Sequence, residues 1–505
     1  MAYPVPAGNK GGTYAADGTV GLAAQVSGNA SQLYQKTLEV YEQSTDFFQQ
    51  LEGTGRDALI KVNTDVSKGA GQKVTIRSLA GFYQEPKEGD EEFSSAADFE
   101  SFVMNDYSLQ VDYIRWATRM TERSEEFMGL RGELKAGVPR EAGKWLGRIK
   151  SERMFMALRE RSSSENKLVV GQKTASTTSS TLLSGDTLSY DEIIAATTKL
   201  KSLGGEPASI STQGKNKVKG YAVISGTDSL FSLETDPTYQ NNLRTGGLRG
   251  NGNLLFTGGY SDVRGNIIMD YNAIDHDGNG AIGSPLNPKA LLGANLTLTV
   301  NSSNVCTDTI TGGGTNTNTS TLFFKYFPGF NYDHGNGDQA VSSGNGPHYL
   351  LIINPNDGSD DANKIAFCKY EGAGKNDGNK IVLTHAANVS GSDDNPLDGV
   401  DSDAAPWSGN MTLVLKQGAT ILPCTSRGVP IAYSLFLSKG AAVRGYGKHR
   451  NKRGIQTHED GFIQDLYIRS VFGQAVREDA SGRKPGVIRL THSVKYPGLA
   501  LPIVQ

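Results

Sequence analysis

The sequence predicts an α+β protein that combines an extended β-hairpin, a long basic helix and a β-rich inserted domain. Two apolar–polar alternating stretches lie within residues 66–118, and the stretch "REAGKWLGRIKSERMFMALRER" has apolar residues at helical spacing. Residues 273–420 alternate short apolar runs with Gly, Asn, Asp, Ser and Thr clusters, which is typical of short strands joined by turns. A chain of 505 residues has room for roughly two to four domains.

The composition is that of an ordinary soluble protein, apart from an excess of glycine at 61 residues. The net charge of -3 provides no global attraction to nucleic acid or to a membrane surface. Cys306, Cys368 and Cys424 are odd in number and form no CxxC pair, so they indicate neither a disulfide framework nor a zinc site. No apolar run approaches the length of a membrane span, and the N-terminus lacks the apolar core of a signal peptide.

The N-terminal part, residues 1–65, is expected to be a Gly/Ala-rich arm followed by a helix from about Ser31 to Leu51. The helix would place Tyr34, Leu38, Tyr41 and Phe48 on one face. Residues 66–118 then form the hairpin, whose strands alternate around Val74 and Ile76 and again through Val111 and Trp116.

The connection between the two hairpin strands is long, polar and acidic. It reads "YQEPKEGDEEFSS" and holds five acids, Glu85, Glu88, Asp90, Glu91 and Glu92. Two strands joined in this way are marginal alone, so we expect the hairpin to need a partner surface.

Residues 119–188 predict a helix from about Thr121 to Lys135, a break at Pro139 and a second, long helix. Residues 189–272 alternate helix and strand: "YDEIIAATTKLKSLG" is a capped helix, "GYAVISG" and "GNIIMDYN" are strands, and the helix between them is interrupted before Pro237. After the β-rich residues 273–420, a composition like that of 189–272 returns at 421–456, and residues 457–505 alternate like strands.

Catalytic motifs are absent from the sequence. "GAGK" at Gly372–Lys375 resembles part of a phosphate loop, but Lys369 stands where the first glycine belongs and Asn376 replaces the Ser/Thr. There is no HExxH, no GxSxG elbow and no deaminase pattern, and the seven histidines complete no triad by spacing. We expect no enzyme and no cofactor.

One stretch, "IDHDGNGAIG", begins like a calcium-binding loop. Asp275, Asp277 and Asn279 match the first three ligand positions and Gly280 matches the turn, but Leu286 stands where the bidentate glutamate is required. The alternative is an Asx-rich turn, because Asp, Asn and Gly all tolerate tight turns. We favour the turn and keep calcium as the alternative.

Several stretches, taken in order, resemble the major capsid proteins of tailed phages, and of N4-like podophages in particular. They are "VSKGAGQKVTIRSL", "EGDEEF", "YSLQVDYIRWATRMTER", "AGKWLGRIKSERMFMAL", "GYAVISGTDSLFSLETDP", "LLFTGGYSDVRGNIIMDYN", "GAAVRGYGKH" and "FIQDLYIRSVFGQAV". The resemblance covers about residues 30–272 and 425–498, and the insertion 273–420 lies outside it.

The resemblance implies the HK97-like phage capsid fold, an N-arm, E-loop, peripheral domain with spine helix and axial domain, here with a β-rich insertion domain. It assigns 1–65 to the arm and helix, 66–118 to the E-loop, 119–188 to the peripheral domain with the spine helix, 189–272 and 421–456 to the axial domain, 273–420 to the insertion and 457–505 to the closing peripheral strands.

The implied function is an icosahedral head of hexamers and pentamers around double-stranded DNA. Implied partners are copies of the chain, a portal protein, a separate scaffolding protein, a decoration protein on the insertion, and packaged DNA bound without sequence specificity, with no membrane. The implied location is the virion shell, assembled in the bacterial host cytoplasm.

A charge-based interface follows as a hypothesis from two runs of opposite sign. The five acids between Glu85 and Glu92 would meet basic surface on an adjacent subunit, either the spine helix or the segment holding Arg444, Lys448, Arg450, Lys452 and Arg453. The alternatives are that both runs are simply solvated, or that the basic segment faces DNA phosphates.

A second function class stays open, a secreted β-rich adhesin or carbohydrate-binding protein with a calcium loop. Its support is the Asp275 loop and the N-x-S/T sequons at Asn295, Asn301 and Asn318. It also requires a signal peptide, which the sequence does not show, and an aromatic cleft.

Overall fold

The computed structural model describes residues 37–55, 57–63, 73–79, 104–121, 131–160, 166–170, 182–183, 185–211, 217–246, 265–271, 286, 290–291, 296–299, 310–311, 348–353, 365–372, 380–385, 412–415, 419–424, 429–458, 463–478 and 484–495. The chain divides into two compact units. Unit 1 is Met1–Met154 with Ala442–Ala475, and unit 2 is Phe155–Ala441 with Val476–Gln505.

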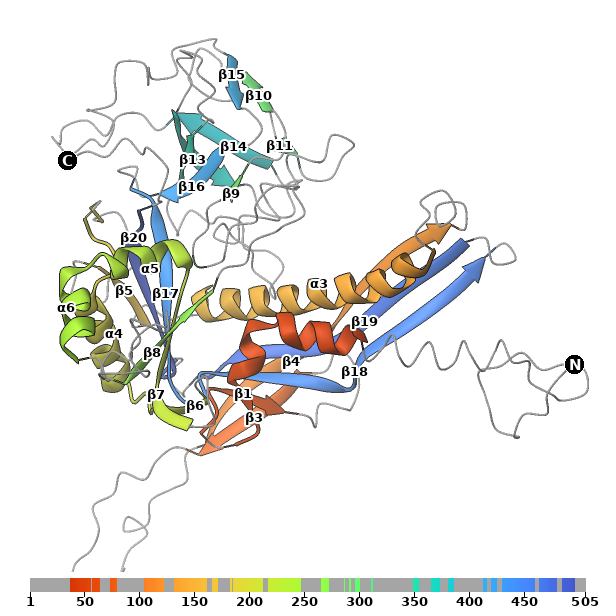
Figure 1. The fold of residues 1–505 in the computed structure, drawn as a ribbon, viewed down its shortest axis with the longest axis horizontal. Helices are drawn as coiled ribbons and strands as arrows, with labels where there is room; N and C mark the ends of the chain where they lie inside the picture. The colour runs from red at the N-terminus through yellow and green to blue at the C-terminus, as the bar shows by residue number, and fades with distance from the viewer. Residues whose placement is uncertain are drawn as a thin grey trace, which may run out of the picture. The chain divides into compact units, whose positions relative to one another are not determined.

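Unit 1 is built on a six-stranded sheet (Figure 1). Its order is β1 (Glu52–Gly53), β2 (Ile60–Asn63), β18 (Ala442–His458), β19 (Ile463–Val476), β4 (Met104–Thr121) and β3 (Lys73–Leu79). β3 and β4 are antiparallel from Lys73↔Gln110 to Leu79↔Met104, so the predicted pairing of the hairpin strands is confirmed. The acidic connection between them lies outside the described residues.

The long helix α3 (Arg131–Glu160) runs along one face of this sheet (Figure 1). Two expectations for this region were wrong. Thr121 ends β4, where it pairs with Ile463 of β19, because the apolar–polar alternation continues to that point and finds a ladder partner. Pro139 lies inside α3 and does not divide it. A proline removes a helical hydrogen bond, but packing of the following turns offsets this loss and keeps the helix continuous.

The N-terminal helix, residues 37–45, is followed at Asp46 by the short 3₁₀ helix η1 (Phe47–Leu51). The single helix expected to reach Leu51 therefore ends early. A core cluster joins this helix to α3 and the sheet, and contains Leu38, Ile114, Ala142, Leu146, Tyr446, Ile468 and Phe472. A smaller cluster on β3, β4, β18 and β19 contains Leu109, Val111, Val443 and Ala475, with Ile76 and Val471 packed against it.

Unit 2 contains a second six-stranded sheet, ordered β5 (Lys167–Val169), β20 (Val487–Ser493), β17 (Ile431–Leu437), β7 (Lys217–Ser225) and β6 (Ala208–Ser211), with β8 (Asn266–Asp270) parallel to β7. The helices α4 (Tyr190–Ser202), α5 (Thr227–Glu234) and α6 (Pro237–Gly246) contribute to its apolar core. The predicted capped helix and the break before Pro237 are both present, and the structure identifies Ser189 as the cap of α4.

The β-rich character predicted for residues 273–420 is confirmed in the described part of that region. One sheet has the order β11 (Ile310–Thr311), β14 (Lys380–His385), β13 (Ile365–Gly372), β12 (His348–Ile353), β16 (Thr420–Cys424) and β9 (Ala290–Leu291). β10 (Leu296–Thr299) pairs with β15 (Thr412–Leu415). The sheet includes β16, so it reaches slightly past residue 420.

Candidate functional site: a buried charge network at the N-terminal helix

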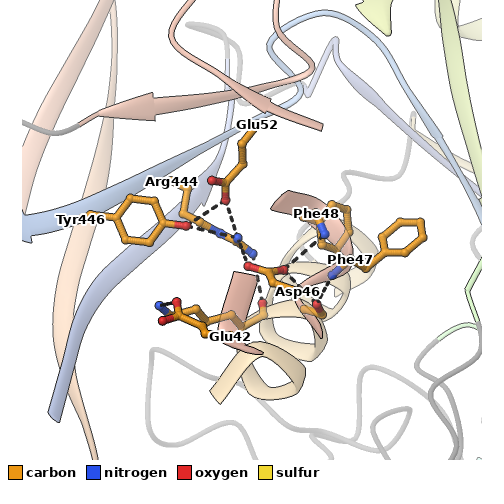
Figure 2. A network of polar contacts seen from close by, with 9 residues as sticks. Glu42, Asp46, Phe47, Phe48, Glu52, Arg444 and Tyr446 are labelled. Carbon is orange, nitrogen blue, oxygen red and sulfur yellow. Dashed lines mark hydrogen bonds and ion pairs between the residues drawn. The ribbon is translucent and has the colours of Figure 1, made fainter. Parts of the chain in front are cut away.

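Five charged side chains gather inside unit 1, where the N-terminal helix, α3 and β18 meet (Figure 2). They are Glu42, Asp46, Glu52, Lys150 and Arg444. Each of the five side chains is at most 4% exposed. Burying charges is costly unless they are paired and hydrogen-bonded, so the arrangement of partners decides what this site does.

Arg444 is the centre of the network. Its Nη1 lies 2.5 Å from Asp46 Oδ2, forms a second ion pair with Glu52, and is 3.4 Å from the Tyr446 hydroxyl. Its Nη2 donates to the Lys150 carbonyl at 3.3 Å. Burial acts to lower the pKa of Arg444, but Asp46, Tyr446 and Glu52 outweigh it and raise the pKa above its ordinary value, so the guanidinium stays charged.

Lys150 supplies the second buried cation, from the middle of α3. Its ammonium forms an ion pair with Glu42 of the N-terminal helix. Its Nζ also lies 5.3 Å from the centroid of the Tyr446 ring and 4.9 Å from that of Phe472, within cation–π range. The lysine therefore joins the N-terminal helix to α3 and to the sheet.

Asp46 both ends the N-terminal helix and starts η1. Its Oδ1 accepts from the Phe48 backbone N–H at 3.2 Å and from the Ser151 hydroxyl at 2.9 Å. The Ser151 hydroxyl oxygen in turn accepts from the Phe47 N–H at 2.9 Å. Asp46 therefore caps η1 and forms an ion pair with Arg444 at the same time. These contacts fix the direction of the chain where the N-terminal helix ends and η1 begins.

Two glycines of α3 allow the N-terminal helix to approach closely. A Cβ added at Gly143 would lie 2.6 Å from the Leu38 carbonyl oxygen, and one at Gly147 would lie 2.6 Å from the Glu42 carbonyl oxygen. Backbone atoms at that distance must move, because real Cβ contacts are longer. The two glycines, one helical turn apart, form the surface against which the N-terminal helix packs.

We expect Gly147→Ala to lower the free energy of unfolding of unit 1 by about 1–2 kcal/mol, because overpacking costs more than the gain in helix propensity. Gly137, in the same helix, has nothing within 4 Å of an added Cβ and provides the control. Gly137→Ala should raise the free energy of unfolding by up to about 1 kcal/mol. Urea unfolding of the unassembled variants measures both, and a stabilising Gly147→Ala would contradict the close packing.

A buried polar chain also crosses the sheet of unit 2. His492 Nδ1 lies 2.9 Å from the Ser493 carbonyl oxygen, which only accepts, so Nδ1 carries the proton. Nε2 then accepts from the Ser434 hydroxyl at 2.9 Å, and Ser434 lies 2.8 Å from the Ser225 hydroxyl. Burial lowers the pKa of His492 to about 4, against a smaller opposing effect of the Ser493 carbonyl. All three side chains are fully buried, so this serine–histidine pair does not meet a substrate.

The predicted site residues are placed as follows. Arg444 is buried and paired within its own chain, so it belongs to the network and not to a basic surface. Lys448, Arg450, Lys452 and Arg453 lie on β18, where only the backbone is described. The acids Glu85, Glu88, Asp90, Glu91 and Glu92 and the loop residues Asp275, Asp277 and Asn279 fall outside the described residues.

Sequence reasoning missed Glu42, Asp46, Glu52 and Lys150 as site residues. A signal existed for Glu42, which stands four residues after Leu38 and so shares the apolar face of the helix, where an acid needs a partner. In the described part of the chain no group of three or more His, Cys, Asp or Glu residues is arranged to hold a metal, and no helix there is long and apolar enough to span a membrane.

Comparisons with known proteins find solved structures of similar fold but no match by sequence. No family model and no curated protein matches the chain. The solved capsid of Ralstonia phage GP4 has a TM-score of 0.50 at 14% identity, covering 90% of this chain and 93% of that one. The capsid of cyanophage Pam1 (TM-score 0.49, 10% identity, 88% and 92% covered) and the head of Helicobacter pylori bacteriophage KHP40 (0.48, 11%, 89% and 91%) are also similar. The likeness to the first shows that this chain has the phage capsid fold that its sequence predicts.

Proposed function

We propose that the chain is the major capsid protein of a tailed phage, which assembles into the hexamers and pentamers of an icosahedral head around double-stranded DNA. The observation that carries this proposal is the fold likeness to a phage capsid over 90% of the chain. The sequence stretches that resemble N4-like podophage capsid proteins support the finer assignment to that branch. The protein is then structural, not enzymatic.

The hairpin supports self-association on physical grounds. The described β3–β4 ladder runs to Leu79↔Met104, and residues 80–103, which include the acidic segment, separate these two positions. β19 and the core of unit 1 stabilise the two strands, but residues 80–103 hold seven acids against one lysine, so we expect a neighbouring subunit to provide the surface for this connection.

The buried network has a role in this function. It fixes the N-terminal helix, residues 37–45, to α3 and β18 through two ion-paired cations. A shell built from hundreds of copies needs the same position of this helix in every copy. A buried network specifies one arrangement, because a displaced helix would leave charges without partners.

The remaining partners and sites belong to the same proposal. They are the portal, a separate scaffolding protein, a decoration protein on the insertion, and DNA held without sequence specificity. The location is the virion shell, after assembly in the bacterial cytoplasm. The acidic segment would meet Lys448, Arg450, Lys452 and Arg453 of an adjacent subunit, and the Asp275 loop is an Asx-rich turn or, alternatively, a calcium site.

Size-exclusion chromatography and negative-stain microscopy of the purified full chain test the proposed function. We expect capsomers, tubes or shells. The Debye length is about 10 Å at 0.1 M salt, so added salt weakens the exposed ion pairs between subunits. The assembled fraction should therefore fall as the salt concentration rises. A compact monomer at every salt and protein concentration would contradict the proposal.

A further inference from the structure

Unit 2 has an acidic end, where β7 ends and α5 begins. Ser225, the last residue of β7, pairs with Asp270 of β8. The chain then enters α5 at Thr227, whose hydroxyl donates to Asp270 Oδ1 at 3.0 Å. Burial raises the pKa of Asp270 above its ordinary value, against this hydrogen bond, and the charges of Glu234 and Asp228 raise it further. Three carboxylates therefore lie close enough to repel one another.

α4 runs from this acidic end towards the opposite end of β7. The N–H of its first residue, Tyr190, donates at 2.8 Å to Oδ2 of Asp236, which stands between α5 and α6. The exposed Asp191 follows in the first turn and adds a further acid to this end. In the last turn of α4, Lys201 Nζ lies 5.5 Å from the ring centroid of Tyr221 on β7. The helix thus carries acids at one end and lysines at the other.

The last turn of α4 and the first half of β7 form a basic end. Lys199 and Lys201 belong to that turn, and the exposed Lys219 lies on β7. One acid, Glu206, is also present here, but its carboxylate pairs at 2.9 Å with Lys439. This end of unit 2 therefore keeps an excess of positive charge.

The two ends are too far apart to neutralise each other within one chain. Ser225 stands six positions after Lys219 on β7, about 20 Å along the strand, and Lys201 stands ten positions after Asp191 on α4, about 15 Å along the helix. Both separations exceed the Debye length of about 8 Å at physiological ionic strength. Within the described part of unit 2, no ion pair involves Asp191, Glu234, Asp270, Lys199, Lys201 or Lys219.

We propose that the acidic end of unit 2 (Asp191, Asp228, Glu234 and Asp270) docks against the basic end (Lys199, Lys201 and Lys219) of a second copy of this chain. The inference rests on the proposed self-assembly and names a contact within it. Opposite charges attract across such a contact, whereas two like ends repel, so the charges select one orientation of the neighbouring copies. Each exposed ion pair contributes little, so the contact depends on several pairs acting together.

The arrangement of the charges favours a ring. The contact joins two different surfaces of the same chain, so each copy in a pair still offers one unused end to a further neighbour. Contacts of this heterologous kind close into a ring when the rotation between neighbours divides a full turn. A ring is the form that the proposed hexamers and pentamers require.

Charge reversal at the two ends of the full chain tests the proposal. The acid-reversed variant carries Asp191→Lys, Asp228→Lys and Glu234→Lys. The base-reversed variant carries Lys199→Glu, Lys201→Glu and Lys219→Glu. Either variant has two ends of the same sign, so each should need about tenfold more protein than the unmodified chain for half-maximal assembly. The combined variant, with all six substitutions, has the net charge of the unmodified chain and two exchanged ends, so it should assemble within about twofold of it.

The matched control reverses both partners of the exposed pair at the basic end. Glu206→Lys with Lys439→Glu leaves the charge of that end unchanged and should leave assembly unchanged. Far-UV circular dichroism checks that each variant is folded. If the reversed variants misfold, Asp191→Asn with Glu234→Gln and Lys201→Gln with Lys219→Gln replace them, and each should raise the required concentration about threefold.

The outcomes separate this contact from the proposed function. Reversed or neutralised variants that assemble like the unmodified chain overturn the contact, and so does a combined variant no better than its two components. A base-reversed variant that assembles normally but binds double-stranded DNA less tightly also overturns it, because the basic end then faces DNA. An unmodified chain that never assembles removes the proposed function as well.

Discussion

Replacing Arg444 with leucine lowers the free energy of unfolding of unit 1 by about 3–5 kcal/mol, the largest single-site effect that we expect. Within the described residues, its guanidinium is the cation with which both Asp46 and Glu52 form ion pairs. Its removal leaves two buried carboxylates without that cation, while the cost of their desolvation remains. Leucine fills part of the volume but offers no donor.

Urea unfolding of the unassembled chain, followed by tryptophan fluorescence, measures this effect. Trp116 and Trp145 pack against the core cluster of unit 1 with ring centroids 6.2 Å apart, so they report on this unit. Glu52→Gln in the Arg444→Leu background should recover part of the loss, because it removes one of the two uncompensated charges.

The control for Arg444→Leu is Lys439→Leu. Lys439 forms a 2.9 Å ion pair with Glu206, whose side chain is 70% exposed, and exposed pairs contribute at most about 1 kcal/mol. Equal losses in the two variants would contradict a special role for the buried network.

Lowering the pH from 6.5 to 4 should remove about 3 kcal/mol of the stability of unit 2 through His492 alone. Burial holds the pKa of His492 at about 4 in the folded chain, below the ordinary value of 6.5. Within this window the unfolded chain binds a proton at this histidine and the folded chain does not, so stability falls as the pH falls. About one pH unit below the folded pKa both states are protonated, and the contribution changes no further.

The difference between the unmodified chain and His492→Gln isolates this contribution, because the other titrating groups are common to both. Glutamine costs some stability at pH 7, where it disturbs the hydrogen bonds to Ser434 and Ser493. The stability advantage of the unmodified chain should then shrink by about 3 kcal/mol between pH 7 and pH 4. An advantage that does not vary with pH would show that His492 has an ordinary pKa.

Local pattern was sufficient for much of the fold. Alternation around Val74 and Ile76 predicts β3, the stretch "YDEIIAATTKLKSLG" predicts α4, and Pro237 marks the start of α6. Two of the errors, at β4 and α3, came from long-range packing. Thr121 is a strand residue because it pairs with Ile463, which is distant in the sequence, and Pro139 stays helical because Ala142 and Leu146 in the following turns pack in the core cluster.

The site was less predictable than the fold, for a related reason. Arg444 lies 398 residues from Asp46 and 392 from Glu52, so no local pattern connects them. Its position among other basic residues favours a solvated or interfacial run, which is the more common outcome for such a sequence. Only the fold shows that the first residue of that run is internal.

Cryo-electron microscopy of the particles formed by the purified full chain tests the central claim most directly. The account predicts closed or tubular lattices in which residues 85–92 of each subunit contact another copy. A chain that stays a folded monomer at high concentration, with the β3–β4 hairpin ordered and touching no second copy, would contradict it.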